Sequence, residues 1–406
     1  MKIKIFAWIM ILSLLLGGCA SGPDDSNPAQ QPTGTEVPTE AIPDPVDFKI
    51  NGVDLESYTI VWAESEYTMY QKLYSKYLPK KDMNEESAER LQAFLRNTCG
   101  IELEVISEKD KTQYQYEIYV GAVTRNELFR TLALGRQQTD SYRIAAGNDC
   151  MYICGGAYGT TWHALDDFET QVKEQLSKNN KVSFEEGFDH SGEYHLIKIG
   201  MVGDSITQGS GSSTKDRGVL AYPNQIGRIL WKDCLVYNYG QAGRTLRDDH
   251  KDSYMASGVY PEALHGAREM DIMTIMLGTN DADRFMSANG EWTAADDAKF
   301  IASCEKLVKS FYDRNNNLKF FLFKSPHCFR LDSNYVAGLP SVWEAQEAAY
   351  DELKNKGYDM LGFLDVAEIT KDLGLYFSDG LHPNDPGHKM MAEAIAEYLQ
   401  GELLDK

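Results

Sequence analysis

The second half of the chain alternates short apolar runs with longer amphipathic stretches, and this alternation restricts the possible folds more than any other feature. Five runs are typical of buried strands, at residues 195–202, 234–237, 271–277, 318–323 and 360–364. Helices are expected near 222–231, 261–268, 294–315, 342–356 and 386–400. Strands that alternate with helices form βαβ units and a parallel sheet. We therefore predict a three-layer α/β/α domain with a mainly parallel five-stranded sheet at residues 190–406.

Residues 48–189 carry a smaller pattern of the same kind. Strands are expected at 58–62, 101–106, 116–121, 142–145, 151–154 and 182–184, and helices at 84–100, 125–134 and 160–176. Together with the larger segment this makes about 360 residues, which exceeds the usual size of one hydrophobic core. We therefore predict that an accessory α/β sandwich domain at 48–189 precedes the larger domain.

The first 47 residues have the composition of export and linker segments. Residues 1–19 contain two lysines, an apolar run at 5–16 that is too short to span a bilayer as a permanent helix, and the ending Leu-Gly-Gly-Cys. This ending resembles a bacterial lipoprotein signal, which implies cleavage before Cys19 and lipidation of its thiol. An ordinary secretory signal is the alternative. Residues 20–47 are rich in proline and acids and poor in large apolar side chains, which predicts a disordered tether.

Charge and cysteine usage exclude several classes of ligand. The formal net charge of −21 argues against nucleic acid and anionic membrane surfaces as partners. The six cysteines after Cys19 have irregular spacing and mostly apolar neighbours, so we expect buried free thiols. No HExxH, EF-hand or P-loop motif occurs. We therefore expect neither a metal nor a cofactor, and the oligomeric state stays open.

Four polar clusters occur in the larger domain, each in a loop after a predicted strand or before the last helix. They are Ser205 with its neighbours, residues 238–245, residues 278–281 and residues 379–383. Adjacent parallel strands bring such loops to one crevice at their carboxyl ends. The four clusters are therefore expected to meet at one site.

The residue types in these clusters suit nucleophilic catalysis. A serine hydroxyl needs a general base, and His382 is a candidate whose ring Asp379 can orient from three positions earlier. An oxyanion needs preorganised donors, and the N–H groups of Ser205 and Gly240 and the amide of Asn280 are suitable. Each residue also has a structural alternative: Asn280 can cap a helix, Gly240 can turn the chain, and Asp379 with His382 can form a surface pair.

In order and position the clusters resemble the four signature blocks of the SGNH (GDSL-type) hydrolases. The blocks read Gly-Asp-Ser-Ile-Thr, Asn-x-Gly-x-x-Gly-x-Thr, Gly-x-Asn-Asp and Asp-x-x-His-Pro. The resemblance covers 190–406 and implies a flavodoxin-like fold. It also implies Ser205 as nucleophile, Gly240 and Asn280 as oxyanion donors, His382 as base and Asp379 as its orienting acid. The Gly-x-Ser-x-Gly motif of α/β-hydrolases is absent.

From this resemblance and from the signal at 1–19 we expect an exported serine esterase, lipid-anchored at Cys19, that removes short acyl groups, most simply acetyl, from an oligo- or polysaccharide. Residues 116–121 and 155–165 resemble the non-catalytic α/β domain that precedes some glycoside hydrolases, which favours a glycan substrate. A lysophospholipase or thioesterase of the same fold is one alternative, and a surface glycan-binding lipoprotein with a vestigial site is another. Whether His327 and Arg330 contact substrate stays open.

Overall fold

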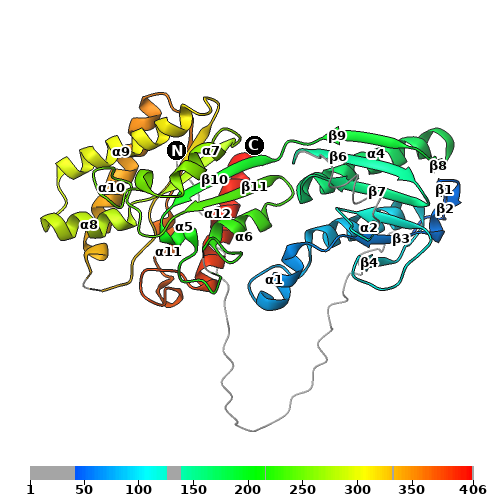
Figure 1. Ribbon diagram of the computed structural model, residues 1–406, viewed down its shortest axis with the longest axis horizontal. Coiled ribbons are helices and arrows are strands. Elements are labelled where there is room, and N and C mark those ends of the chain that lie inside the picture. The colour runs from blue at the N-terminus through cyan, green and yellow to red at the C-terminus, as the bar shows by residue number, and fades with distance from the viewer. Residues whose placement is uncertain (1–41, 126–138, 215, 332, 405–406) are drawn as a thin grey trace, which may run out of the picture. The chain divides into compact units, whose positions relative to one another are not determined.

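The computed structural model describes residues 42–125, 139–214, 216–331 and 333–404 (Figure 1). The predicted signal peptide and residues 20–41 of the predicted tether lie outside these ranges, as does nearly all of the helix predicted at 125–134. Ile42–Lys406 form one compact unit. Within the described ranges no helix is long and apolar enough to cross a membrane.

The five strands predicted in the second half of the chain form one sheet. Its order is β11-β10-β12-β13-β14, and every neighbouring pair is parallel. The strands are β10 (Ile197–Gly203), β11 (Cys234–Gly240), β12 (Ile272–Met276), β13 (Lys319–Phe323) and β14 (Met360–Leu364). This is the order of flavodoxin-like folds, in which ligands bind beyond the carboxyl ends of the strands where the strand order reverses. The reversal here lies between β10 and β12.

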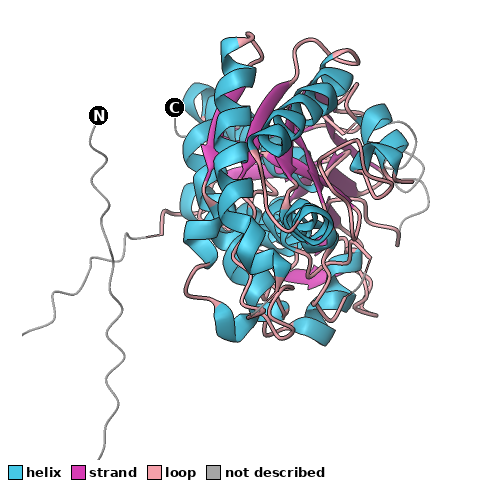
Figure 2. Ribbon diagram, turned by 90° about the vertical axis from the view of Figure 1, so that its left-hand side faces the viewer, coloured by secondary structure: helices cyan, strands magenta, loops and turns pink. Residues whose placement is uncertain are grey.

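Helices cover both faces of this sheet, so the predicted three layers are confirmed (Figure 2). One hydrophobic core contains residues of α7, α9 and α10, and the other contains residues of α6, α11 and α12. Strand β12 contributes to both cores because its successive side chains point to opposite faces. The helices are α5 (Ser205–Gln208), α6 (Tyr222–Ile229), α7 (Tyr260–Gly266), α8 (Thr279–Asn289), α9 (Ala294–Tyr312), α10 (Asn334–Asn355), α11 (Val366–Thr370) and α12 (Asp385–Leu403).

Helix α10 begins eight residues before its predicted start at 342, although Pro340 lies inside it. The Ser333 side chain caps the helix by accepting a hydrogen bond from the Val336 N–H at 3.4 Å. Gly338 allows close packing on α8, since an added Cβ would lie 2.7 Å from the Ala282 carbonyl oxygen. Packing of this kind offsets the hydrogen bond that a proline removes from a helix interior.

The residues before β10 form two further sheets. A six-stranded sheet has the order β4-β3-β5-β7-β6-β9, and a three-stranded sheet has the order β2-β1-β8. The strands are β1 (Asp47–Ile50), β2 (Val53–Asp54), β3 (Thr59–Trp62), β4 (Val105–Ser107), β5 (Glu117–Val120), β6 (Ser141–Gly147), β7 (Cys150–Gly155), β8 (Lys181–Phe184) and β9 (Asp189–Glu193). Helices α1 (Glu66–Tyr74), α2 (Met83–Cys99) and α4 (Tyr158–Asn179) accompany them. An α/β domain before the larger sheet is thus confirmed.

Strand β9 was not predicted because its sequence is polar and it lies at a sheet edge, where one neighbour suffices. The boundary predicted between 189 and 190 falls inside this strand, whose five residues pair with β6. The division into independently folding domains stays a prediction. All six cysteines after Cys19 are buried and free, as expected from their apolar contexts.

Candidate active site

Ser205 lies at the carboxyl end of β10, in the first turn of the short helix α5. The Asp204 side chain caps this helix by accepting a hydrogen bond from the Ile206 N–H at 3.0 Å. First-turn N–H groups have no partner within their helix and carry partial positive charge. The Ser205 N–H has no acceptor among the residues that the structure describes, so it is available to an anion.

His382 reaches Ser205 across 177 residues of sequence. Its Nε2 lies 3.0 Å from Ser205 Oγ, and its Nδ1 lies 2.8 Å from Asp379 Oδ2. Gly380 makes the intervening turn with φ of 76°, in the left-handed region that favours glycine. The three predicted side chains thus form one hydrogen-bonded line, in which a proton can move from the serine hydroxyl to the imidazole.

The Asp379 carboxylate is held by backbone as well as by the histidine. Its Oδ1 accepts hydrogen bonds from the Leu381 N–H at 2.9 Å and the His382 N–H at 2.7 Å. Burial alone would raise the pKa of Asp379, but the hydrogen bonds from His382 and Leu381 outweigh burial and lower that pKa to about 2. The carboxylate is therefore ionised wherever His382 can act as a base.

Asn280 lies in the first turn of α8 and is buried beside Asp204. Its Nδ2 donates to Asp204 Oδ2 at 3.3 Å and to the Arg244 carbonyl oxygen at 3.1 Å. These contacts fix the amide against the loops after β10 and β11. The structure thus brings Asn280 to the same end of the sheet as Ser205, as predicted.

Gly240 has a different environment from the one expected of an oxyanion donor. Its N–H donates to Asn238 Oδ1 at 2.9 Å. An added Cβ at Gly240 would lie 2.5 Å from the Thr207 carbonyl carbon, so the glycine permits close packing of β11 on α5. Donation from Gly240 to an oxyanion stays a prediction and requires the bond to Asn238 to break.

Gly243, three residues later, is a candidate that the sequence reasoning missed. It has φ of 73°, open space where a Cβ would stand, and an N–H with no acceptor among the residues the structure describes. The next residue, Arg244, contacts Asn280 through its carbonyl oxygen. The signal was present in the sequence, because Gly243 is the second glycine of the 238–245 cluster.

Two buried aspartates, Asp204 and Asp281, support the loops of the site. Asp281 accepts hydrogen bonds from the backbone N–H groups of Leu246 and Arg247 at 2.8 and 2.9 Å. Burial raises the pKa of Asp204 and of Asp281 to about 6 in each case, against the opposing effect of their backbone hydrogen bonds. Their contacts connect the loops after β10, β11 and β12.

His327 and Arg330, in the loop after β13, occupy different positions. The His327 ring lies 4.9 Å from the Trp343 ring and 5.9 Å from the Phe329 ring, between centroids. Burial lowers the pKa of His327. Arg330 contacts Asp379, with Nη2 3.0 Å from Oδ2. Arg330 therefore touches the site directly, whereas His327 packs among aromatic side chains.

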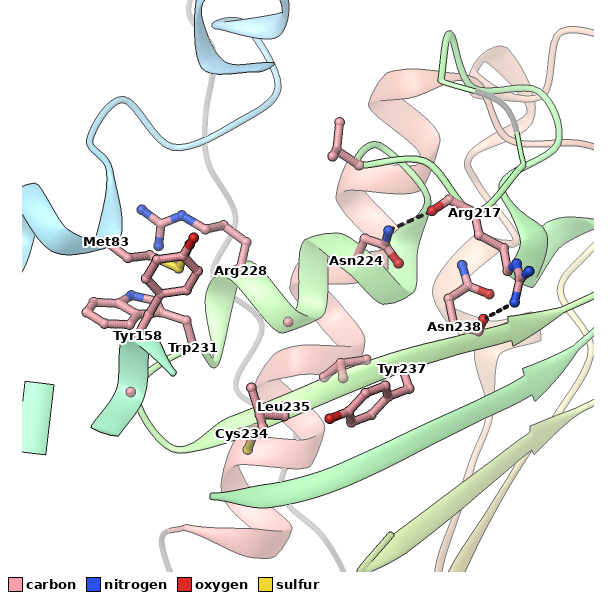
Figure 3. Close-up of a pocket in the computed structure, with 14 residues that line it drawn as sticks. Met83, Tyr158, Arg217, Asn224, Arg228, Trp231, Cys234, Leu235, Tyr237 and Asn238 are labelled. Atoms are coloured by element: carbon pink, nitrogen blue, oxygen red, sulfur yellow. Dashed lines mark hydrogen bonds between the residues drawn. The ribbon is translucent and has the colours of Figure 1, made fainter. Parts of the chain in front are cut away.

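A cavity of about 490 Å³ lies beside β11 and α6, and its lining does not include Ser205 or His382 (Figure 3). Two of its polar side chains bond to the backbone of other lining residues: Asn224 donates to the Arg217 carbonyl oxygen at 2.8 Å, and Arg217 donates to the Asn238 carbonyl oxygen at 3.3 Å (Figure 3). Ser205 instead lies at the carboxyl end of the sheet and is 8% exposed, whereas the Asp379 side chain on the other side of the His382 ring is 45% exposed. Within the described ranges no group of three or more His, Cys, Asp or Glu side chains could hold a metal ion.

Comparison with known proteins gives one family match and one curated relative. The model of the GDSL-like Lipase/Acylhydrolase family matches residues 201–390. An acetylxylan esterase of Xylanibacter ruminicola is 28% identical over 220 residues, which cover 50% of this chain and 43% of that protein. The chain thus spans less than half the length of this relative.

Solved structures similar to the chain include two carbohydrate esterases. A family two carbohydrate esterase from Clostridium thermocellum in complex with cellohexaose has a TM-score of 0.40 and 17% identity, covering 52% of this chain and 66% of that chain. An acetyl xylan esterase from the rumen bacterium Butyrivibrio proteoclasticus has a TM-score of 0.37 and 16% identity, covering 54% and 67%. The family match spans all four loops described above, and residues 201–390 are therefore a domain of the GDSL-like lipase/acylhydrolase family.

Proposed function

We propose that this protein is a serine esterase in which Ser205 is the nucleophile, His382 the base and Asp379 the orienting acid. The observation that carries the proposal is the line of contacts from Asp379 Oδ2 through the imidazole to Ser205 Oγ, at 2.8 and 3.0 Å. Asp379 binds Nδ1–H and so leaves the lone pair of Nε2 facing the hydroxyl. Neither distance requires movement before a proton can be transferred.

The reaction follows from this arrangement. Ser205 Oγ attacks the ester carbonyl carbon while His382 Nε2 accepts the hydroxyl proton, which gives a tetrahedral oxyanion. His382 then gives the proton to the leaving alcohol as the ester C–O bond breaks, and the acyl group stays on Ser205. Water, deprotonated by the same nitrogen, attacks the acyl-enzyme and releases the acid.

In the proposal, three donors at the Ser205 end of the sheet stabilise the oxyanion. They are the N–H of Ser205, the N–H of Gly243 and the side-chain amide of Asn280. The amide now donates to Asp204 at 3.3 Å and to the Arg244 carbonyl oxygen at 3.1 Å, and it gives up one of these bonds when it donates to the oxyanion. Gly243 is preferred to Gly240 because the Gly240 N–H already donates to Asn238. The Gly243 N–H is fixed by the backbone and has no bond to break before it donates, whereas the Gly240 N–H would first have to leave Asn238.

We further propose that the substrate is a short acyl ester, most simply acetyl, on an oligo- or polysaccharide outside the cell. The acetylxylan esterase relative supports the acyl group and the carbohydrate. The signal at 1–19 supports export and attachment through lipidated Cys19, which mass spectrometry of the mature N-terminus tests.

A substrate screen tests this function. Acetylated xylan, acetylated mannan and O-acetylated peptidoglycan are compared with a lysophospholipid and an acyl thioester, with Ser205→Ala as the control. Acetate release from at least one glycan by the wild type alone is the expected result. Turnover confined to the phospholipid or thioester would contradict the substrate class, and glycan binding without any turnover would favour the vestigial site.

A further inference from the structure

Arg330 contacts Asp379, the proposed orienting acid, through two separate atoms. Its Nη2 donates to Asp379 Oδ2 at 3.0 Å, and its Nε donates to the Asp379 carbonyl oxygen at 3.2 Å. The guanidinium lies 5.7 Å from the centroid of the Tyr335 ring, and the Arg330 side chain is 41% exposed. A planar guanidinium with several fixed donors suits such a two-point contact.

The backbone around Arg330 is fastened to the same loop. The Phe329 N–H donates to the Gly380 carbonyl oxygen at 2.6 Å, and Cys328 Sγ lies 3.3 Å from that oxygen. An added Cβ at Gly380 would lie 2.9 Å from the Arg330 nitrogen. The loop after β13 and the 379–382 loop are thus in close backbone contact, which places the guanidinium at Asp379.

Arg330 and His382 share one carboxylate oxygen. Asp379 Oδ2 accepts from His382 Nδ1 at 2.8 Å and from Arg330 Nη2 at 3.0 Å, while Oδ1 is occupied by backbone N–H groups. These two distances place the donor nitrogens less than about 6 Å apart. The guanidinium therefore opposes the positive charge that His382 gains when it takes the serine proton, and it also diverts part of the carboxylate's negative charge.

We propose that Arg330 is a positioning residue that acts on His382 through Asp379. Arg330 holds Asp379 Oδ2 at His382 Nδ1. Its positive charge also disfavours a positive charge on the imidazole. The imidazole therefore stays neutral, and able to accept the serine proton, at a lower pH than it would without Arg330. This rests on the proposed function of Ser205, His382 and Asp379. The esterase should therefore stay active to a lower pH than it would without Arg330.

Other charged or titratable groups also face His382. Asp204, before α5, and His388, on α12, both interact with it electrostatically. Neither changes when Arg330 is replaced, so a difference between variants reports on Arg330. In water, a unit charge about 6 Å from a titrating group displaces the titration of that group by roughly half a pH unit, and salt reduces this displacement.

The test is the pH profile of kcat/KM for 4-nitrophenyl acetate with the full chain. Arg330→Met and Arg330→Gln both remove the charge, and both should move the acid limb upward by roughly half a pH unit. Arg330→Lys keeps the charge, so its acid limb should stay near that of the wild type while kcat falls. Arg96→Met, which removes an arginine of similar exposure (43%) on α2, should change neither quantity.

An unshifted acid limb in a folded, active Arg330→Met or Arg330→Gln variant would overturn the inference. So would a change confined to KM for an acetylated polysaccharide, because that result makes Arg330 a substrate contact. Failure of the proposed function looks different. In that case the wild type shows no acid limb, or Ser205→Ala retains full activity.

Discussion

Replacement of Asp379 by asparagine removes the negative charge of the side chain but keeps its shape. The carboxylate receives four donors, two backbone N–H groups on Oδ1 at 2.9 and 2.7 Å and two side chains on Oδ2 at 2.8 and 3.0 Å. In Asp379→Asn the backbone donors keep the amide oxygen at the Oδ1 position. The amide NH₂ then faces two groups that are themselves donors, His382 Nδ1–H and the Arg330 guanidinium.

The imidazole relieves this conflict by moving its proton from Nδ1 to Nε2. Nε2–H then donates to Ser205 Oγ and can no longer accept the serine proton. The same exchange in a serine protease triad lowers kcat by about 10⁴-fold, which corresponds to about 5 kcal/mol of transition-state stabilisation. We expect a loss of this order for Asp379→Asn, with a folded protein, because the shape of the side chain is kept.

The assay is kcat for 4-nitrophenyl acetate at a pH where the wild type is fully active. Asp313→Asn is the matched control, since Asp313 is an exposed aspartate on the surface that pairs with Lys309. Circular dichroism and thermal unfolding establish that both variants fold. Activity of Asp379→Asn within about tenfold of the wild type would refute the role of the carboxylate in fixing the tautomer.

Three further predictions concern an oxyanion donor, a close packing contact and the buried histidine. Asn280→Ala should lower kcat by about 10²–10³-fold with a small change in KM, measured by steady-state kinetics; an unchanged kcat would remove Asn280 from the oxyanion site. Gly240→Ala should lower both turnover and melting temperature, because its Cβ would overlap the backbone at Thr207 and Gln208; normal values for both would contradict the close packing of β11 on α5. Burial lowers the pKa of His388 to about 4, below the value of 6.5 for an exposed histidine, so this residue contributes stability that is full above about pH 6.5 and is lost as pH falls toward 4. His388→Gln should weaken this part of the acid destabilisation in chemical denaturation, and identical pH dependence in both proteins would exclude it.

The sequence was sufficient to predict the parallel sheet and to bring Ser205, His382, Asp379 and Asn280 to one end of it. Apolar strands that alternate with amphipathic helices specify the layers, and parallel strands specify which loops meet. The pairing of Asp379 with His382 could be anticipated because both lie in one short turn. Such relations depend only on spacing and on the direction of the strands.

The features that the sequence did not reveal depend on side-chain direction and tertiary packing. The Asn238 side chain turns back to accept from Gly240, and no spacing rule shows that this N–H is already paired. The contact of Arg330 with Asp379 joins loops 49 residues apart. The early start of α10 depends on Gly338 packing against α8, which outweighs the local effect of Pro340.

The most direct test of the central claim is the identity of the nucleophile. The wild type, Ser205→Ala and His382→Ala are compared in hydrolysis of 4-nitrophenyl acetate, and peptides from acid-quenched reactions are analysed by mass spectrometry for a trapped acetyl group. We predict acetyl on Ser205 in the wild type and a loss of turnover of several orders of magnitude in both variants. Unchanged hydrolysis by Ser205→Ala, or an acetyl group trapped on another residue, would contradict the account.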